Sequence, residues 1–146
     1  MQKKSKPKKG VFTWFDLKLL KRLTNDLIEH AKILSKKFYQ YSSTFDFECS
    51  TFLDPKCLED YNYIFVSDWA FDCAIPYIQF TAIDDKDEVR EVAEISITYF
   101  KMTLQEIDKL EKECEKMMAK EDKKKEEKKE YEEFLRLKQK FEGGKK

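Results

Sequence analysis

Apolar residues first follow a regular pattern between positions 13 and 41. They recur at spacings of three and four, which is the period of an amphipathic helix, at Leu20, Leu23, Leu27, Ala31, Leu34 and Phe38. Thr13 and Asp16 stand three residues apart at the start of this run. That spacing is typical of a capping box, in which each side chain bonds the backbone amide of the other residue. We therefore predict a helix from residue 13 to about residue 41.

The middle of the chain changes to a period of two, which indicates strands with one buried face. Alternating runs occupy residues 45–51, 61–65, 69–73, 78–82 and 89–99, and Asp54-Pro55 predicts one or two turns over 55–60. Residues 84–87 read as a hairpin turn without glycine, because aspartate tolerates the left-handed region and caps its own backbone. Glu91 interrupts the apolar side of the returning strand, so we expect a bend or a bulge there.

The last pattern is again helical. Thr103 and Glu106 have the capping-box spacing, and no helix-breaking residue follows before Glu142. An apolar stripe lasts to about residue 118, residues 121–130 are only Lys, Glu and Asp, and apolar residues then return at Tyr131, Phe134, Leu135 and Phe141. A helix of about 40 residues spans roughly 60 Å. Its distal half should therefore project, and the terminal aromatic patch is a candidate docking site.

These patterns together predict an α+β fold. The N-terminal amphipathic helix and the start of the long C-terminal helix would pack on one face of an antiparallel meander of four or five strands. We expect three parts: a disordered basic arm over residues 1–10, an α+β domain over 11–118, and a projecting charged helix with its aromatic patch over 119–146.

Charge is segregated along the chain although the formal net charge is zero. Residues 44–100 contain 13 acidic and three basic side chains. We expect the strands to present an acidic face to solvent, made of Asp46, Glu48, Asp68, Asp72, Glu88, Glu91 and Glu94. Such a face would attract a protein partner with a basic surface, and the alternative is that it serves solubility alone.

The basic arm carries Lys3, Lys4, Lys6, Lys8 and Lys9. These lysines could neutralise phosphates of a nucleic acid, or they could bind the acidic sheet of the same chain. Only three arginines accompany 26 lysines, which is too few for much sequence reading, because arginine is the residue that contacts bases bidentately. A nucleic-acid-binding accessory protein is therefore the alternative function rather than the favoured one.

Candidate chemistry is sparse. No glycine stands between Val11 and Glu142, which excludes glycine-dependent phosphate loops and nucleophile elbows in that stretch. His30 is the single histidine, so a zinc site with several histidines cannot form; we interpret it as a surface or half-buried helix residue. Asp84-x-Lys86 is similar to the acid-x-Lys pattern of metal-dependent nucleases, but a solvated hairpin turn is the favoured interpretation. We expect no catalytic residue, no metal site and no cofactor.

Four cysteines without CxxC spacing predict free thiols in a reducing compartment. The longest uncharged stretch, residues 73–83, is too short to span a bilayer, and we expect no membrane partner. Abundant Lys, Ile, Asn, Phe and Tyr indicate an AT-rich genome. We expect a cytoplasmic protein of a bacterial cell, or of a virion assembled there. It would be a non-enzymatic interaction module: an adaptor, an inhibitor or an assembly subunit of phage or mobile-element origin. Self-association through the C-terminal helix stays open.

Overall fold

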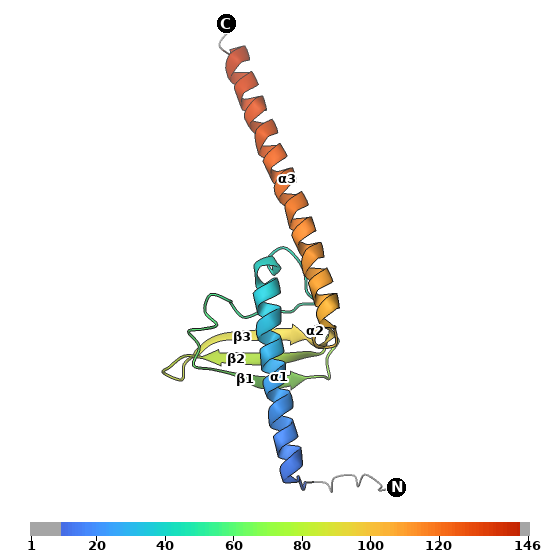
Figure 1. Ribbon diagram of the computed structural model, residues 1–146. Coiled ribbons are helices and arrows are strands. Elements are labelled where there is room, and N and C mark those ends of the chain that lie inside the picture. The colour runs from blue at the N-terminus through green and yellow to red at the C-terminus, as the bar shows by residue number, and fades with distance from the viewer. Residues whose placement is uncertain (1–9, 144–146) are drawn as a thin grey trace. The chain divides into compact units, whose positions relative to one another are not determined.

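A computed structural model of the chain describes residues 10–143 and shows an α+β protein (Figure 1). The chain divides into two compact units, residues 1–102 and residues 103–146. The first unit contains, in order, α1 (Trp14–Phe38), the 3₁₀ turn η1 (Tyr39–Tyr41), β1 (Tyr63–Ala70), β2 (Tyr77–Ile83), β3 (Val89–Ser96) and α2 (Ile97–Phe100). The second unit contains α3 (Leu104–Gly143). The predicted disordered arm lies outside the described residues, apart from Gly10.

The start and the end of α1 confirm the sequence prediction. The Thr13 hydroxyl accepts a hydrogen bond from the Asp16 amide at 3.1 Å, and the Asp16 carboxylate accepts one from the Thr13 amide at 2.9 Å. The helix ends at Phe38 and continues as the single 3₁₀ turn η1. Lys36 and Lys37 lie in its last turn, where positive charge interacts favourably with the negative end of the helix dipole.

The sheet is an antiparallel meander, but it has three strands in the order β1-β2-β3 and not the four or five expected. No strand forms over residues 45–51. Glu48 and Cys49 adopt left-handed backbone angles, with φ of 54° and 59°, and Asp46 accepts the Cys49 amide at 2.8 Å. This turn ends the alternation, and the following residues reach the edge of β3 by isolated hydrogen bonds only, such as Thr51 N to the Glu94 carbonyl.

The runs expected over 61–65 and 69–73 also differ from the prediction. The structure joins parts of both in one strand, β1, whose register shifts between Val66 and Asp68. Ser67 is the additional residue of this bulge, and its hydroxyl contacts Gln79 on the neighbouring strand. Residues 71–76 form a loop. A single bulge therefore makes one strand read as two interrupted runs, because it reverses which face the next residues occupy.

The hairpin confirms the expected bulge near Glu91. Ala82 pairs with Glu91 and Ile83 pairs with Val89, which leaves Arg90 without a partner in the register. Glu91 thereby stays on the face of Ala82, while Val89 lies on the opposite face. In the turn itself Asp87 has φ of 58°, so aspartate adopts the left-handed conformation that glycine usually supplies.

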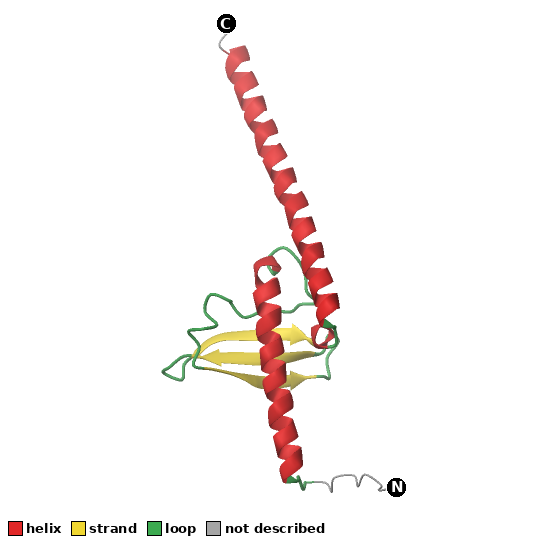
Figure 2. Ribbon diagram, viewed as in Figure 1, coloured by secondary structure: helices red, strands yellow, loops and turns green. Residues whose placement is uncertain are grey.

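The core of the first unit lies between α1 and one face of the sheet, which α1 crosses (Figure 2). Phe38 is fully buried there, with its ring centroid 5.2 Å from that of Phe47 and 6.0 Å from that of Phe52. Buried Ser35 donates to the Ala31 carbonyl and accepts the Leu53 amide at 3.1 Å. We call the face of the sheet that meets α1 the inner face and the opposite one the outer face.

The second unit is a continuous helix. Thr103 and Glu106 form the predicted capping box, with the Thr103 hydroxyl accepting the Glu106 amide at 3.2 Å. The helix then runs to Gly143 without a break, as the sequence predicts. Packing of its first turns on the sheet stays a prediction.

Candidate functional site

The leading half of α1, residues 14–23, carries an apolar surface that the described part of its unit leaves uncovered. Its stripe continues the one that enters the core, yet Leu20 and Leu23 are 58% and 48% exposed. In Figure 1 this half of the helix extends past the strands. A shallow groove of about 330 Å³ runs along it, lined by Phe12, Asp16, Leu17, Leu19, Leu20 and Leu23. Water therefore contacts a surface that has the composition of a core.

Aromatic residues extend this surface beyond the stripe. Trp14 and Phe15 are each 72% exposed, and Phe12, which precedes them, is 67% exposed. At 100° per residue, Trp14 and Phe15 lie roughly 110–150° around the helix from the line through Leu20 and Leu23, on the side of Lys18 and Arg22. The ammonium of Lys18 stands 5.3 Å from the centre of the Trp14 ring, a cation–π contact. The leading half is therefore apolar over more of its circumference than an ordinary core-facing helix.

The same segment is strongly basic. Lys18, Lys21 and Arg22 are exposed on the side away from Leu20, and five lysines precede the helix in the sequence. Residues 1–22 contain eight basic side chains and one acidic side chain. That acid is Asp16, whose pKa is lowered by its contacts with the amide and then the hydroxyl of Thr13. An occupant of this surface should therefore be apolar and negatively charged.

The outer face of the sheet is the second uncovered surface. At its hairpin end the rings of Tyr63 and Phe65 stack 5.8 Å apart, and Val89 and Val92 are exposed. The alternation over residues 89–99 puts Val89 on the apolar side of the returning strand, and the bulge at Arg90 turns it to the outer face instead. This end of the outer face is apolar, although the alternation predicted an acidic face.

The other end of the outer face is acidic. Asp68 and Glu94 flank Gln79 in the register, and the Gln79 amide donates to Glu94 at 3.3 Å. Tyr77 lies on the same face, and its pKa is raised, mainly by the charge of Glu94, then by burial and by Asp68. Three exposed acids of the hairpin turn region, Asp85, Asp87 and Glu88, adjoin the opposite end.

The seven acids proposed as one face are distributed over several places. Asp68 and Glu94 share the outer face, while Glu91 lies on the inner-face side of β3. Glu48 accepts hydrogen bonds from the hydroxyls of Ser96 and Thr98 at 2.7 and 2.8 Å. The remaining three are Asp46 in the 46–49 turn, Asp72 in the loop after β1 and Glu88 at the hairpin. The strand register and the missing strand over 45–51 explain why the set does not gather on one face.

Glu91 belongs to a groove of about 610 Å³, lined by Tyr39, Asp54, Cys57, Asp60, Tyr61, Asp84, Asp85, Arg90 and Glu91. Its carboxylate accepts the Asp54 amide and a very short hydrogen bond from the Tyr61 hydroxyl. Burial, then the hydrogen bond to Glu91, raises the pKa of Tyr61. Burial and the charge of Asp54 raise the pKa of the Cys57 thiol. A thiol with a raised pKa is a poor nucleophile at neutral pH. The Cys57 thiol and the Tyr61 hydroxyl are therefore both in their neutral, protonated forms at that pH.

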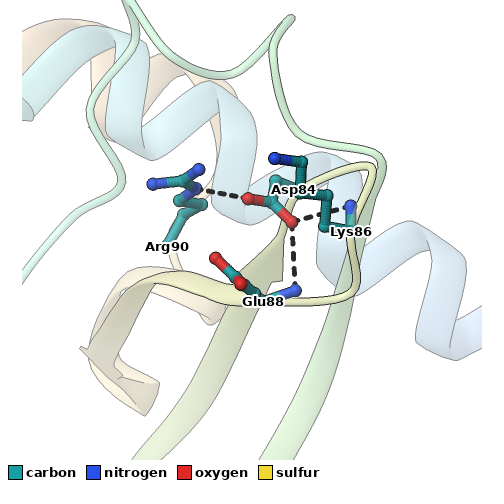
Figure 3. A network of polar contacts seen from close by, with 4 residues as sticks. All are labelled: Asp84, Lys86, Glu88 and Arg90. Carbon is teal, nitrogen blue, oxygen red and sulfur yellow. Dashed lines mark hydrogen bonds and ion pairs between the residues drawn. The ribbon is translucent and has the colours of Figure 1, made fainter.

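Asp84 organises the hairpin turn (Figure 3). One carboxylate oxygen accepts the amides of Lys86 and Glu88 at 2.9 and 3.0 Å, and the other accepts Arg90 Nε at 2.6 Å. These bonds, the Glu88 amide first, lower the pKa of Asp84. In the Asp84-x-Lys86 pair it is therefore the backbone amide of Lys86 that contacts the carboxylate. Across residues 10–143, no group of three or more His, Cys, Asp or Glu side chains is arranged to hold a metal ion.

The structure also locates the other residues that the sequence singled out. His30 is half-buried, as expected, with Nε2 3.2 Å from the Tyr99 carbonyl oxygen and its ring 5.3 Å from Phe100. The four cysteines are free thiols. The predicted patch on α3 is exposed, at 62% for Tyr131, 60% for Phe134, 41% for Leu135 and 75% for Phe141.

Sequence reasoning missed the leading half of α1 as a surface, because it assigned the whole stripe to the core. The signal was the excess of aromatic residues at its start: Phe12, Trp14 and Phe15 lie off the stripe. Comparison of the chain with known protein families, with curated proteins and with solved structures finds no match. None of the described helices is both long and apolar enough to cross a membrane.

Proposed function

We propose that this chain is a non-enzymatic protein-interaction module that docks through the leading half of α1. The observation that supports this proposal is the uncovered apolar stripe at Leu20 and Leu23, with the exposed side chains of Phe12 and Leu17 beside it in the same groove. Fully burying one such side chain contributes about 1.5–3 kcal/mol. Four of them can therefore offset a substantial part of the association cost of several kcal/mol.

Two further surfaces fit an adaptor, an inhibitor or an assembly subunit of phage or mobile-element origin. The acids of the middle segment favour a partner with basic groups. The exposed patch of Tyr131, Phe134, Leu135 and Phe141 on α3 offers a separate apolar contact. A protein with more than one such contact can connect other components without chemistry of its own.

Site-specific photo-crosslinking in the producing cell tests the proposal. A photoreactive amino acid replaces Leu20 on the apolar side of α1 or, as the matched control, Asn25, which is exposed on the lysine side. We expect discrete protein adducts from position 20 and few from position 25, because only the apolar side should be buried in a complex. Equal labelling at both positions, or none at position 20, would contradict the proposal.

Nucleic acid is the alternative partner, favoured by the exposed side chains of Lys18, Lys21 and Arg22. In that case the basic side of α1 and the arm would contact phosphates. Position 25 would then give adducts that disappear after nuclease treatment, and position 20 would not. The same experiment therefore separates the two functions.

A further inference from the structure

We infer that the surface which receives the leading half of α1 is the outer face of the sheet in a second copy of this chain. This inference rests on the proposed function and names its partner. Both surfaces belong to the first unit, and both are left uncovered by the described residues of that unit. The contact would join the apolar side of α1 at Leu20 and Leu23 to the apolar end of the outer face at Val89 and Val92.

The two surfaces match in type. The trailing half of α1 already packs on the inner face of its own sheet, where Leu34 and Phe38 are fully buried. A helix on a sheet is a stable layer arrangement, because each element buries one apolar side against the other. The leading half continues the same stripe, and the outer face presents valines together with the stacked rings of Tyr63 and Phe65. The contact between the leading half of α1 and the outer face of another copy would therefore repeat the helix-on-sheet packing that the trailing half makes with its own sheet.

Charge decides between a helix and a sheet as the partner. Residues 1–22 carry eight basic side chains against one acidic side chain, so two copies of this segment repel each other. The outer face carries Asp68 and Glu94 at one end and adjoins the exposed acids of the hairpin at the other. Opposite charges attract the helix to the sheet and disfavour contact between two helices.

The contact joins two different surfaces, the helix of one copy and the sheet face of another. Two copies that exchange their helices reciprocally form a closed dimer, and copies that do not close form longer assemblies. In both cases each molecule offers one helix and one sheet face. A copy with a defective helix can still receive a helix, and a copy with a defective sheet can still donate one.

This property gives a complementation test by sedimentation velocity and light scattering on the full chain. Leu20→Asp places a charge on the helix surface, and Val92→Asp places one on the sheet surface. We expect the wild type to reach a molar mass of at least twice the 17.6 kDa of one chain, and each variant alone to stay at the mass of one chain. An equimolar mixture of the two variants should recover a species of twice that mass and no larger one, because the two variants together have only one intact helix and one intact sheet face.

The controls isolate the surfaces. Asn25→Asp adds the same charge on the exposed lysine side of α1 and should associate like the wild type. Circular dichroism checks the fold of each variant, and Leu23→Asp with Val89→Asp, both at exposed positions, replace the first pair if either fails to fold. High salt should lower the mass of the wild type, because it screens the attraction between the surfaces.

Three results would overturn the inference. A wild type that remains at the mass of one chain at every concentration excludes a second copy as the partner. Assembly that Leu20→Asp abolishes and Val92→Asp leaves intact indicates contact between helices. A mixture of the two variants that fails to associate excludes the helix-to-sheet contact. If position 20 then still crosslinks to a different protein, the interaction function stands and only this partner is wrong; if the wild type instead sediments with anionic lipid vesicles, the occupant is a membrane surface.

Discussion

The two halves of α1 share one apolar stripe and have opposite surroundings. In the trailing half, residues 24–38, Ala31, Leu34 and Phe38 are fully buried. In the leading half, residues 14–23, Leu20 and Leu23 lie on the same line and remain largely exposed. The spacing of apolar residues therefore identifies a side of a helix that is to be buried, but it does not say whether the chain's own sheet or another molecule covers it.

Two hydroxyls show the same contrast: Thr24 adjoins the leading half, and Ser35 lies deep in the trailing half, where it is buried. Thr24 donates to the Leu20 carbonyl at 2.8 Å, and Ser35 donates to the Ala31 carbonyl at 2.8 Å. Only Ser35 has a second role, since it also accepts the Leu53 amide from a distant loop. A local interaction becomes part of the tertiary structure only where another segment lies against the helix.

The largest test of this comparison exchanges one phenylalanine in each half for alanine. Phe38→Ala should lower the free energy of unfolding by about 3–5 kcal/mol, because it leaves a cavity among Phe47, Phe52 and Tyr99. Phe15→Ala, at a position 72% exposed, should change it by no more than about 0.5 kcal/mol. Urea unfolding of dilute protein measures both. Similar losses would mean that the leading half is part of the same cooperative core.

A smaller effect is expected for the two hydroxyls. Ser35→Ala should cost about 1–3 kcal/mol, because it leaves the buried amide of Leu53 without its acceptor. Thr24→Ala removes a helix hydroxyl with the same local bond, and alanine has the higher helix propensity, so stability should stay within about 0.5 kcal/mol of the wild type. Unfolding by urea again gives both values. A Thr24→Ala loss as large as that of Ser35→Ala would show that this part of α1 is covered.

Local chemistry in the sequence predicted a good part of the fold. Thr13 with Asp16 and Thr103 with Glu106 form the expected capping boxes. Glu91 marks a real bulge: it stays on the inner-face side itself, and the extra residue Arg90 moves Val89 to the outer face. Each of these features depends on residues close together in the chain, which is why pattern and spacing are sufficient to find them.

The errors arose where alternation was taken as proof of a strand. Residues 45–51 alternate perfectly, yet left-handed angles at Glu48 and Cys49 fold them into a turn. Phe47, one of the alternating residues, is buried against Phe38 all the same. Burial of alternate side chains therefore does not require a hydrogen-bonded ladder. The same limit applies to the acidic set, since Glu91 and Glu94 fall on opposite faces once the register is known.

The candidate site was predictable in chemistry and not in position. The sequence shows an apolar, aromatic and basic N-terminal segment and an acidic middle. It does not show that α1 extends beyond the sheet, because the overlap between the helix and the sheet depends on where the strands lie. The exposed patch on α3 was easier to find, since the charged stretch of residues 121–130 separates it from any core-forming stripe.

The smallest effect concerns the first turn of α1, where the leading half has only its cap to hold it. Thr13→Ala should destabilise that turn by about 1 kcal/mol. Little of this loss should appear in the urea unfolding of the whole unit, because an uncovered helix end frays without opening the core. Amide hydrogen exchange should quicken at Asp16 and stay unchanged at Phe38. Thr13→Ser keeps the hydroxyl and serves as the control.

Acid should open the same turn. The pKa of Asp16 is lowered from its ordinary value of 3.8 by its contacts with Thr13. The stabilisation is therefore fully present above pH 3.8 and is lost as the pH falls through the lower pKa of the folded state. Carbon chemical shifts of residues 14–17, followed by NMR during acidification, should lose helical character in step with protonation of Asp16. In Asp16→Asn these shifts should not follow that titration. A first turn of the wild type that keeps its helical shifts after Asp16 is protonated would show that something other than the cap, such as a docked partner, holds the leading half of α1.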